Sequence, residues 1–470
     1  MDFYPGCMVL ITVFCFFQSV INFLPLFSFF IMNRVSVNDG CTAMIFCSED
    51  DFTRIALKAK AAQDYFLLIG PPGTGKTSCA LKKMVETFHA DKDAQILLLS
   101  YTNRAVDEIC KSLASIAPAV DFIRVGSELS CDEAYRGHLI ENELSSCNRR
   151  SEVYERIRNC RIIVGTVAAI SGKPELFRLK HFDVAIIDEA TQILEPQLLG
   201  ILCARGEDGK DAIDKFVLIG DHKQLPAVVQ QNTEQSAIYD ESLLSIGLTN
   251  LKDSLFERLY RNCTATVHRS YDMLCRQGRM HPEVALFANR AFYGGRLIPV
   301  GLPHQIESSD TICRLAFYPS VPEKAGASAK INYSEARIVA DLAVRIYEHH
   351  QSDFDESRTL GIITPYRSQI ALIKKEIESL GIPALNRILV DTVERFQGSE
   401  RDVIIYSFCV NYPYQLKFLS NLTEEEGVLI DRKLNVALTR ARKQMFITGV
   451  PELLERNPLY KSLLKLIESF

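Results

Sequence analysis

The stretch that decides the fold is YFLLIGPPGTGKT, from Tyr65 to Thr77. Its first five residues form an apolar run that is too short for a helix and is typical of a buried parallel strand. The residues from Gly70 onward have the spacing G-x-x-x-x-G-K-T, and a helical pattern comes after them. A strand, a glycine-rich turn and a helix in this order predict a loop that cradles phosphate groups.

The glycine, lysine and threonine residues of this loop each suit phosphate binding for a chemical reason. Gly70, Gly73 and Gly75 let backbone N–H groups close around a phosphate at the start of a helix, where the helix dipole adds positive potential. We expect Lys76 to reach the β- and γ-phosphate oxygens and the hydroxyl of Thr77 to bind Mg²⁺. The loop therefore predicts a site for a nucleoside triphosphate with its magnesium ion.

Short apolar runs alternate with amphipathic segments along the rest of the chain, which indicates a doubly wound α/β fold with parallel sheets. In the first half the predicted strands are Tyr65–Ile69, Gln95–Leu99, Arg161–Val164, Asp183–Ile187 and Phe216–Ile219. In the second half they are Leu360–Ile363, Ile388–Val393, Val403–Phe408 and Met445–Thr448. The predicted helices are Ser78–Phe88, Asn103–Leu113, Ser254–Tyr260, Glu335–Tyr347 and Ser368–Leu380, the last of which Gly381 ends.

The pattern predicts three parts. Residues 1–46 are an apolar segment, residues 47–266 a first α/β domain and residues 267–470 a second one, with the boundary near Val267. We expect Ser309–Lys330 to be a surface excursion of the second domain.

The apolar segment allows two interpretations. Residues 7–32 carry no charged side chain and are long enough to span a bilayer. Arg34, the nearest cation, would favour a cytoplasmic side for the remainder of the chain. The alternative is a mis-assigned start upstream of Met44. We therefore expect a cytoplasmic protein, with a membrane anchor through residues 7–32 as the alternative to such an artefact.

The composition argues against a uniformly basic surface and against a metal centre built from cysteines. The net charge of -5 argues against a wholly basic coat, although a locally basic groove is compatible with it. The 14 cysteines include no C-x-x-C pair, which argues against a zinc or iron–sulfur site.

Polar residues come directly after two further predicted strands. Asp188 and Glu189 stand immediately after DVAII, where ligands bind at the carboxyl edge of a parallel sheet. We expect Asp188 to complete the Mg²⁺ shell and Glu189 to activate the attacking water. Gln224, in GDHKQLP, is placed to sense the γ-phosphate. Taken alone, the acidic pair would more often be a helix start, and Gln224 would more often belong to a polar turn.

The stretch LNVALTRAR, Leu434 to Arg442, carries two arginines far from the phosphate loop in the sequence. On a helical projection of residues 434–443, Arg440 and Arg442 flank an apolar face on opposite sides. One of them can reach a γ-phosphate and stabilise charge in phosphoryl transfer. In isolation the pair would more often be ordinary surface arginines of a helix.

Together the motifs resemble superfamily 1 helicases, in the branch of the nonsense-mediated-decay RNA helicase and the replication nuclease–helicase. The likeness covers about residues 51–450. Its motifs, in order, are GPPGTGKTS, SYTNRAVDEI, GTVAAI, IIDEATQ, GDHKQLPAV, QGRMHPEVALFANRAFYGGRL, ITPYRSQI, DTVERFQGSERDVIIYS and LNVALTRARK.

The resemblance implies two RecA-like domains that bind ATP and Mg²⁺ between them and move on single-stranded DNA or RNA, in the 5′→3′ direction. It makes Arg440 the arginine finger, Arg279 a second γ-phosphate contact and Glu400 a neighbour of the ribose. It also implies a set of nucleic-acid contacts, namely Thr102, Asn103, Thr166, Tyr366 and Arg367.

Two positions depart from the resemblance. Phe52 stands where relatives carry an adenine-reading glutamine, and Gly278 replaces a tyrosine before the arginine of RMHP. These changes leave nucleotide choice open. The alternatives to a helicase are a nucleic-acid-binding ATPase switch and a truncated remnant that does not unwind duplexes.

Overall fold

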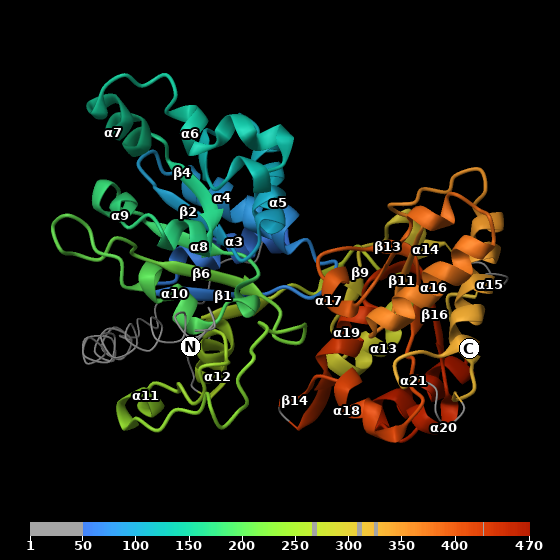
Figure 1. Ribbon diagram of the computed structural model, residues 1–470. Helices are drawn as coiled ribbons and strands as arrows, with labels where there is room; N and C mark the ends of the chain where they lie inside the picture. The colour runs from blue at the N-terminus through green and yellow to red at the C-terminus, as the bar shows by residue number, and fades with distance from the viewer. Residues whose placement is uncertain (1–49, 266–269, 308–312, 324–327, 426) are drawn as a thin grey trace, which may run out of the picture. The chain divides into compact units, whose positions relative to one another are not determined.

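The computed structural model describes residues 50–265, 270–307, 313–323, 328–425 and 427–470 (Figure 1). The apolar segment 7–32 and the expected boundary at Val267 lie outside these residues. Within the described part, no helix is long and apolar enough to cross a membrane.

Contacts divide the described residues into two compact units. The first unit comprises 50–67, Ala80–Leu218 and Pro226–Asp272, and the second comprises Leu68–Cys79, Ile219–Leu225 and Met273–Phe470. The phosphate loop and the loop that carries Gln224 thus belong with the carboxyl-terminal half of the chain.

The first sheet has the order β3-β4-β2-β5-β6-β1-β7. The registered pairs β2–β4, β2–β5, β3–β4 and β5–β6 are all parallel. Its strands are β1 (Tyr65–Ile69), β2 (Ile96–Ser100), β3 (Phe122–Val125), β4 (Ile162–Thr166), β5 (Val184–Ile187), β6 (Phe216–Gly220) and β7 (Tyr271–Met273). Five of these match predicted strands, whereas β3 and β7 were not predicted.

Helices separate these strands along the chain. The main ones are α3 (Asp51–Ala61), α4 (Lys82–His89), α5 (Asn103–Ala114), α6 (Ile140–Glu143), α7 (Arg150–Asn159), α8 (Val167–Ser171), α9 (Glu175–Leu179), α10 (Glu195–Leu202), α11 (Glu241–Ser245) and α12 (Leu255–Ala265). Helix α4 comes after a wide turn of π geometry, Lys76–Leu81.

The second sheet has the order β10-β16-β13-β11-β12, and its pairs are all parallel. Its strands are β10 (Leu315–Pro319), β11 (Leu360–Ile363), β12 (Leu389–Asp391), β13 (Arg401–Ser407) and β16 (Ala441–Gly449). The prediction that Ser309–Lys330 is a surface excursion is therefore wrong for 315–319. This run, LAFYP, pairs along its whole length with Met445 to Gly449 and forms the edge of the sheet.

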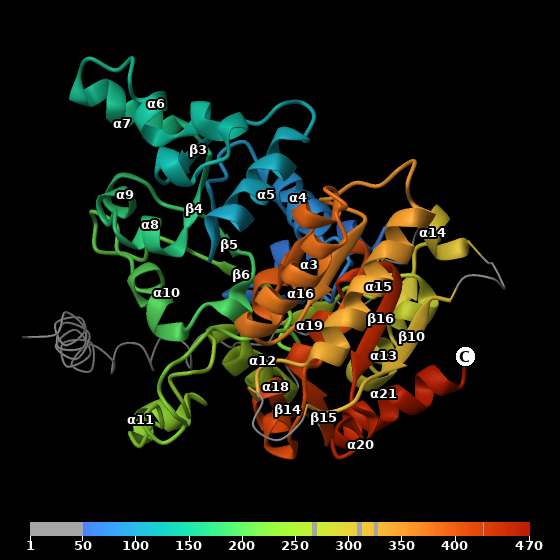
Figure 2. The same ribbon diagram turned by 45° about the vertical axis from the view of Figure 1, so that its right-hand side comes forward.

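Helices cover the second sheet (Figure 2). Apolar residues of α15 (Tyr333–His349) and α16 (Arg367–Ser379) form one buried cluster with those of β11, β12, β13 and β16. The other elements here are β8 (Arg276–Gln277), α13 (Pro282–Phe292), β9 (Ile298–Pro299), α14 (Pro303–Ile306), α17 (Val393–Phe396), α18 (Leu416–Leu419), β14 (Leu422–Glu425), β15 (Val428–Asp431), α19 (Arg432–Leu438), α20 (Pro451–Leu454) and α21 (Pro458–Glu468). Two α/β units with parallel sheets confirm the predicted fold class.

The expected helix through both arginines is wrong. Helix α19 ends at Leu438, where the Thr439 hydroxyl donates to the carbonyl of Asn435 at 2.7 Å. Strand β16 then begins at Ala441, and the Arg401 N–H donates to the carbonyl of Arg440 at 3.0 Å. Residues 441–444 extend the strand that was predicted at Met445–Thr448, because pairing of β16 with β13 at Ala441 and Gln444 outweighs their local helical preference.

Candidate nucleotide site and nucleic-acid interface

The phosphate loop is shaped mainly by its own residues. Gly73 and Gly75 have φ angles of 73° and 74°, in the left-handed region that glycine adopts without strain. The Thr74 hydroxyl donates to the carbonyl of Pro71 at 2.7 Å and closes the turn. The Gly75 carbonyl accepts from Cys79, which starts the helical turn that contains Lys76 and Thr77.

Close approach also requires glycine at two positions of this loop. A Cβ atom on Gly70 would lie 2.8 Å from Cβ of Lys76, and one on Gly73 would lie 2.4 Å from Cβ of Arg279. The Gly73 carbonyl accepts from the N–H of Gly278 at 2.8 Å. The tight fit therefore places Arg279, the expected second γ-phosphate contact, directly against the phosphate loop.

The segment Gly220–Leu225 begins at the end of β6 and carries Gln224. The Gln224 amide donates to Asp221 at 2.7 Å, and the Tyr293 hydroxyl donates to the same carboxylate oxygen of Asp221 at 2.7 Å. The Asn435 amide donates both to the carbonyl of Lys223 and to the Tyr293 hydroxyl, at 2.7 and 2.8 Å. Asn435 of α19, and Tyr293 directly after α13, thus hold this loop from the side of the second sheet.

Arg440 reaches the same loop. Its guanidinium donates to the side-chain oxygen of Gln224 at 3.2 Å, although the two residues are 216 positions apart. The side chain is buried, and among the described residues its other acceptors are the carbonyls of Val436 and Ser399 and the Thr439 hydroxyl. Burial, together with the like charge of Arg279, lowers the pKa of Arg440 to about 9. A buried cation with neutral acceptors favours a nearby anion.

Arg279 and Glu400 form an ion pair. Nε of Arg279 lies 2.5 Å from a carboxylate oxygen of Glu400, and Nε of Arg442 lies 3.7 Å from the other. Burial raises the pKa of Glu400, but these arginines outweigh burial and leave the pKa below its ordinary value. The structure thus brings together Arg279, which was expected at the γ-phosphate, and Glu400, which was expected at the ribose.

Asp188 and Glu189 lie in the first unit, directly after β5. Asp188 is almost fully buried, and its carboxylate accepts from the N–H of Glu189 at 2.9 Å. Glu189 has a φ of 54°, a left-handed conformation that is costly for a residue with a Cβ. The strained turn fixes both carboxylates at the carboxyl end of the strand, where the sequence placed them.

The predicted nucleic-acid contacts of the first unit are helix caps. The Thr102 hydroxyl accepts from Ala105 at the start of α5, and the Thr166 hydroxyl accepts from Ala169 at the start of α8, each at 3.1 Å. Because Ser100 of β2 pairs with Thr166 of β4, these two caps lie at the same edge of the sheet. Asn103 is the first residue of α5 and is half-buried.

Tyr366 and Arg367 lie at the start of α16 in the second unit. Arg367 is exposed, whereas Tyr366 is half-buried and its hydroxyl accepts from the Gln415 amide at 3.2 Å. Burial raises the pKa of Tyr366. The Gln415 amide also donates to the carbonyl of Ala329, which fixes it beside the tyrosine.

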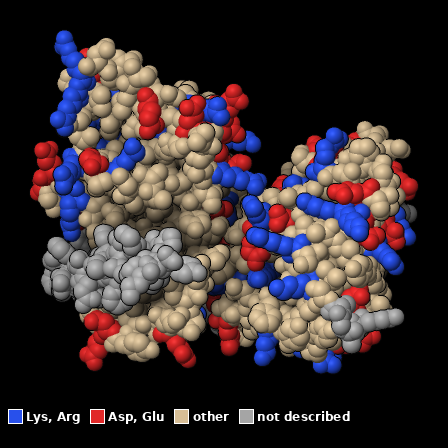
Figure 3. Space-filling view, viewed as in Figure 1, with Lys and Arg blue, Asp and Glu red and all other residues tan. Residues whose placement is uncertain are grey.

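Charge is mixed on the surface. On the face shown in Figure 3, lysines and arginines stand among aspartates and glutamates, and neither sign forms a continuous coat. This distribution agrees with the small net charge of the chain.

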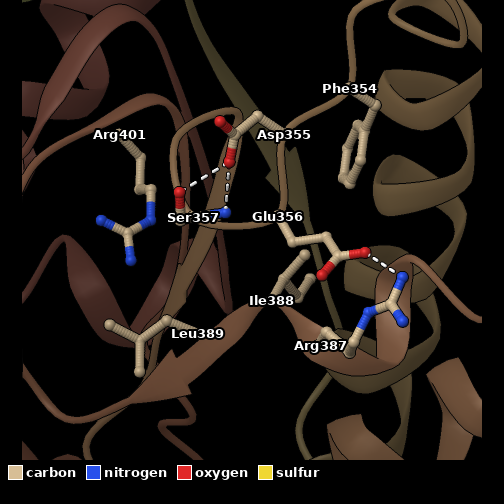
Figure 4. Close-up of a pocket in the computed structure, with 8 residues that line it drawn as sticks. All are labelled: Phe354, Asp355, Glu356, Ser357, Arg387, Ile388, Leu389 and Arg401. Atoms are coloured by element: carbon tan, nitrogen blue, oxygen red, sulfur yellow. Dashed lines mark hydrogen bonds and ion pairs between the residues drawn. The ribbon is translucent and has the colours of Figure 1, made fainter.

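A separate cavity of about 650 Å³ lies at the amino ends of β11, β12 and β13 (Figure 4). Its charged lining consists of two carboxylates, Asp355 and Glu356, and two arginines, Arg387 and Arg401, and Glu356 points toward Arg387. Arg387 forms an ion pair with Glu356, and Asp355 accepts from the Ser357 hydroxyl at 2.6 Å. The predicted site residues do not line this cavity.

Sequence reasoning missed Asp221, Tyr293 and Asn435. Each stands within a quoted motif, so the signal was present in GDHKQLPAV, in AFYGG and in LNVALTRAR. Their contacts span 72, 142 and 212 positions, and no local pattern predicts such pairs. Phe52, at the expected adenine-reading place, is half-buried in α3.

Comparisons with known proteins agree with one another. Two family profiles, each described as AAA domain, match residues 48–152 with 141–232 and residues 251–452. The chain is 31% identical over 411 residues to the DNA replication ATP-dependent helicase/nuclease DNA2 of Gallus gallus, covering 86% of this chain and 36% of that protein. It is 25% identical to the DNA polymerase alpha-associated DNA helicase A of Saccharomyces cerevisiae, covering 87% and 65%.

The chain spans a little over a third of the length of the helicase/nucleases that it matches. Among solved structures, an arterivirus nonstructural protein 10 (helicase) in complex with DNA shares 15% identity over 87% of this chain and 65% of that chain, with a TM-score of 0.42. A TM-score this low adds nothing to the description of the fold.

Proposed function

Because this chain belongs to the superfamily 1 helicases, in the branch of the replication nuclease–helicases, we propose that it is an ATP-driven translocase or helicase. In this proposal it hydrolyses ATP and moves along single-stranded DNA or RNA in the 5′→3′ direction. The names of its relatives favour DNA as the first substrate to test.

The observation that carries the proposal is the contact between Arg440 and Gln224. A buried guanidinium meets the side chain of a strand-end loop, and its acceptors among the described residues are neutral. The nearby carboxylates of Glu400 and Asp221 raise the pKa of Arg440 but do not offset burial, and a γ-phosphate would supply a charged acceptor. Arg440 would then stabilise charge in the transition state, while Gln224 reports whether the γ-phosphate is present.

The residues of the phosphate loop suit a triphosphate. Its backbone N–H groups would enclose the β-phosphate, Lys76 would contact the β- and γ-oxygens, and Arg279 would add a second positive charge. Glu400, held ionised by Arg279, is proposed as the neighbour of the ribose.

Mg²⁺ fits the oxygen donors that the chain offers. The hydroxyl of Thr77 and the carboxylate of Asp188 are hard ligands, and Mg²⁺ takes few protein ligands beside phosphate oxygens and water. The ion would neutralise phosphate charge when bound. Glu189, next to Asp188 and fixed by its strained turn, would orient the attacking water and take its proton.

Nucleic acid would lie across the strand ends. In the first unit Thr102, Asn103 and Thr166 stand at helix starts on one edge of the sheet, where backbone N–H groups suit phosphate oxygens. In the second unit we assign Arg367 to a phosphate and Tyr366 to a base or sugar. These contacts would grip the backbone without reading sequence.

The test is steady-state ATP hydrolysis by the full chain without nucleic acid, with single-stranded DNA and with single-stranded RNA. We expect stimulation by one of the two and none of it in Lys76→Ala. Strand displacement on a duplex with a 5′ overhang then separates a helicase from an ATPase switch. A folded wild-type chain that hydrolyses no ATP under any condition would overturn the proposal and favour an inactive remnant.

A further inference from the structure

A carboxylate of the hairpin β14–β15 contacts the loop that carries Gln224. Both oxygens of Glu425 lie 2.9 Å from Nε2 of His222, and one lies 3.5 Å from Nζ of Lys223. His222 is only 6% exposed and the side chain of Glu425 is 20% exposed, so this contact is partly shielded from water. We propose that Glu425 is a positioning residue that holds Gly220–Leu225 in place for ATP hydrolysis. The inference rests on the proposed function.

The electrostatics of the contact keep the Glu425 carboxylate ionised. Burial raises the pKa of Glu425, but His222 and Lys223 outweigh burial and bring the pKa to about 2. At neutral pH the carboxylate is therefore charged and only accepts hydrogen bonds, so Nε2 of His222 must carry the proton. Charge-assisted hydrogen bonds of this kind are stronger than neutral ones.

The hairpin is itself well anchored. Glu425 pairs with Val428 across the antiparallel hairpin, and β15 ends at Asp431. The Asp431 carboxylate accepts from the N–H groups of Lys433 and Leu434 and from the Tyr460 hydroxyl. Strand β15 and α19 are thereby joined without a break, and the position of Glu425 is fixed relative to α19.

The stretch 425–440 therefore contacts three successive residues of the loop, which are His222, Lys223 and Gln224. Glu425 binds the side chains of His222 and Lys223, Asn435 binds the carbonyl of Lys223, and Arg440 binds Gln224. Arg440 and Gln224 are proposed to meet the nucleotide, whereas Glu425 contacts His222 and Lys223 and acts through them. Without it, one side of the loop would lose its anchor.

The test compares Glu425→Ala with Glu424→Ala, a matched change at the exposed neighbouring position of β14. We expect Glu425→Ala to lower kcat for ATP hydrolysis roughly tenfold, because small misplacement of a reacting group is costly. KM for ATP should stay within about twofold, since the phosphate loop is untouched. Glu425→Gln keeps an acceptor for His222 but loses the charge, so its kcat should be intermediate.

The outcomes separate the two proposals. If the wild type hydrolyses ATP and Glu425→Ala has the kcat of Glu424→Ala, the positioning role is overturned and the proposed function stands. A rise in KM with kcat unchanged would place the defect in ATP binding and would also overturn the positioning role. A folded wild type without hydrolysis overturns the proposed function and this inference with it. Thermal unfolding of each variant checks its fold.

Discussion

The phosphate loop and the loop Gly220–Leu225 both stand at the end of a strand, yet they are held in different ways. The first is shaped by its own left-handed glycines and by a turn from Thr74 to Pro71. The second is held by Tyr293, Glu425, Asn435 and Arg440. The first loop should therefore respond to changes within it, and the second to changes far away in the sequence.

The largest effect should come from the distant partner of the second loop. Arg440→Ala removes the buried charge and the contact with Gln224, and we expect kcat for ATP hydrolysis to fall roughly 10³-fold. Arg440→Lys keeps a charge but loses the planar fork, so it should recover only part of the rate. Steady-state ATP hydrolysis at saturating single-stranded DNA measures kcat of both variants. Full activity of Arg440→Ala would contradict the claim that the second loop depends on distant residues.

A change within the first loop should act on binding. Gly73→Ala must adopt a φ of 73° and would bring its Cβ within 2.4 Å of Cβ of Arg279. We expect affinity for a non-hydrolysable ATP analogue to fall roughly a hundredfold, measured by equilibrium titration. Gly137→Ala is the matched control, because a Cβ there meets nothing within 4 Å. Equal affinity of the two variants would contradict the account.

The buried carboxylate of Glu335, in the second unit, should affect stability more than ATP hydrolysis. Glu335 is fully buried and accepts from the Ser407 hydroxyl and the Cys409 N–H, and burial raises its pKa from 4.5 to about 7. Its contribution to stability is therefore present below pH 4.5 and lost as pH rises through about 7. Relative to Glu335→Gln, the wild type should lose roughly 2 kcal/mol of unfolding free energy between pH 5 and 8.

Urea unfolding of both proteins at each pH measures this difference. An unchanged difference would mean that Glu335 stays ionised in the folded state. Either way, kcat at a fixed pH should be less sensitive to Glu335→Gln than to Arg440→Ala, because Glu335 contacts neither loop.

The smallest effect is expected at a local cap in the first unit. Thr102→Ala removes the acceptor for the Ala105 N–H and should cost about 1 kcal/mol of stability at the start of α5. Amide hydrogen exchange in the first turn of α5 would detect it, and Thr102→Ser should restore protection. Identical exchange in all three proteins would show that the cap is unimportant.

Features set by local chemistry were predictable from the sequence. Strands β1 and β11 begin and end where the apolar runs do, and Gly381, with a φ of 68°, ends α16 as expected. The strand ends that carry Asp188 and Gln224 were also predicted, because polar residues stand directly after buried runs.

Features set by pairing between distant parts of the chain were not predictable from the sequence. Residues 439–443 look helical in isolation but leave the helix, because β16 pairs with strands at 315–319 and 401–407. The edge strand β10 was missed for the same reason, since its partner lies 130 positions away, as in Leu315 and Met445. The residues that hold Gly220–Leu225 are also distant from it in the sequence. The only signal for them was that Tyr293 and Asn435 stand within the quoted motifs.

The most direct test of the account is a double-mutant cycle on Gln224 and Arg440, read as kcat for ATP hydrolysis with single-stranded DNA. The account predicts that Gln224→Ala adds little once Arg440→Ala is present, with a coupling energy of at least about 1 kcal/mol. Additive losses would contradict it, because the two side chains would then act independently.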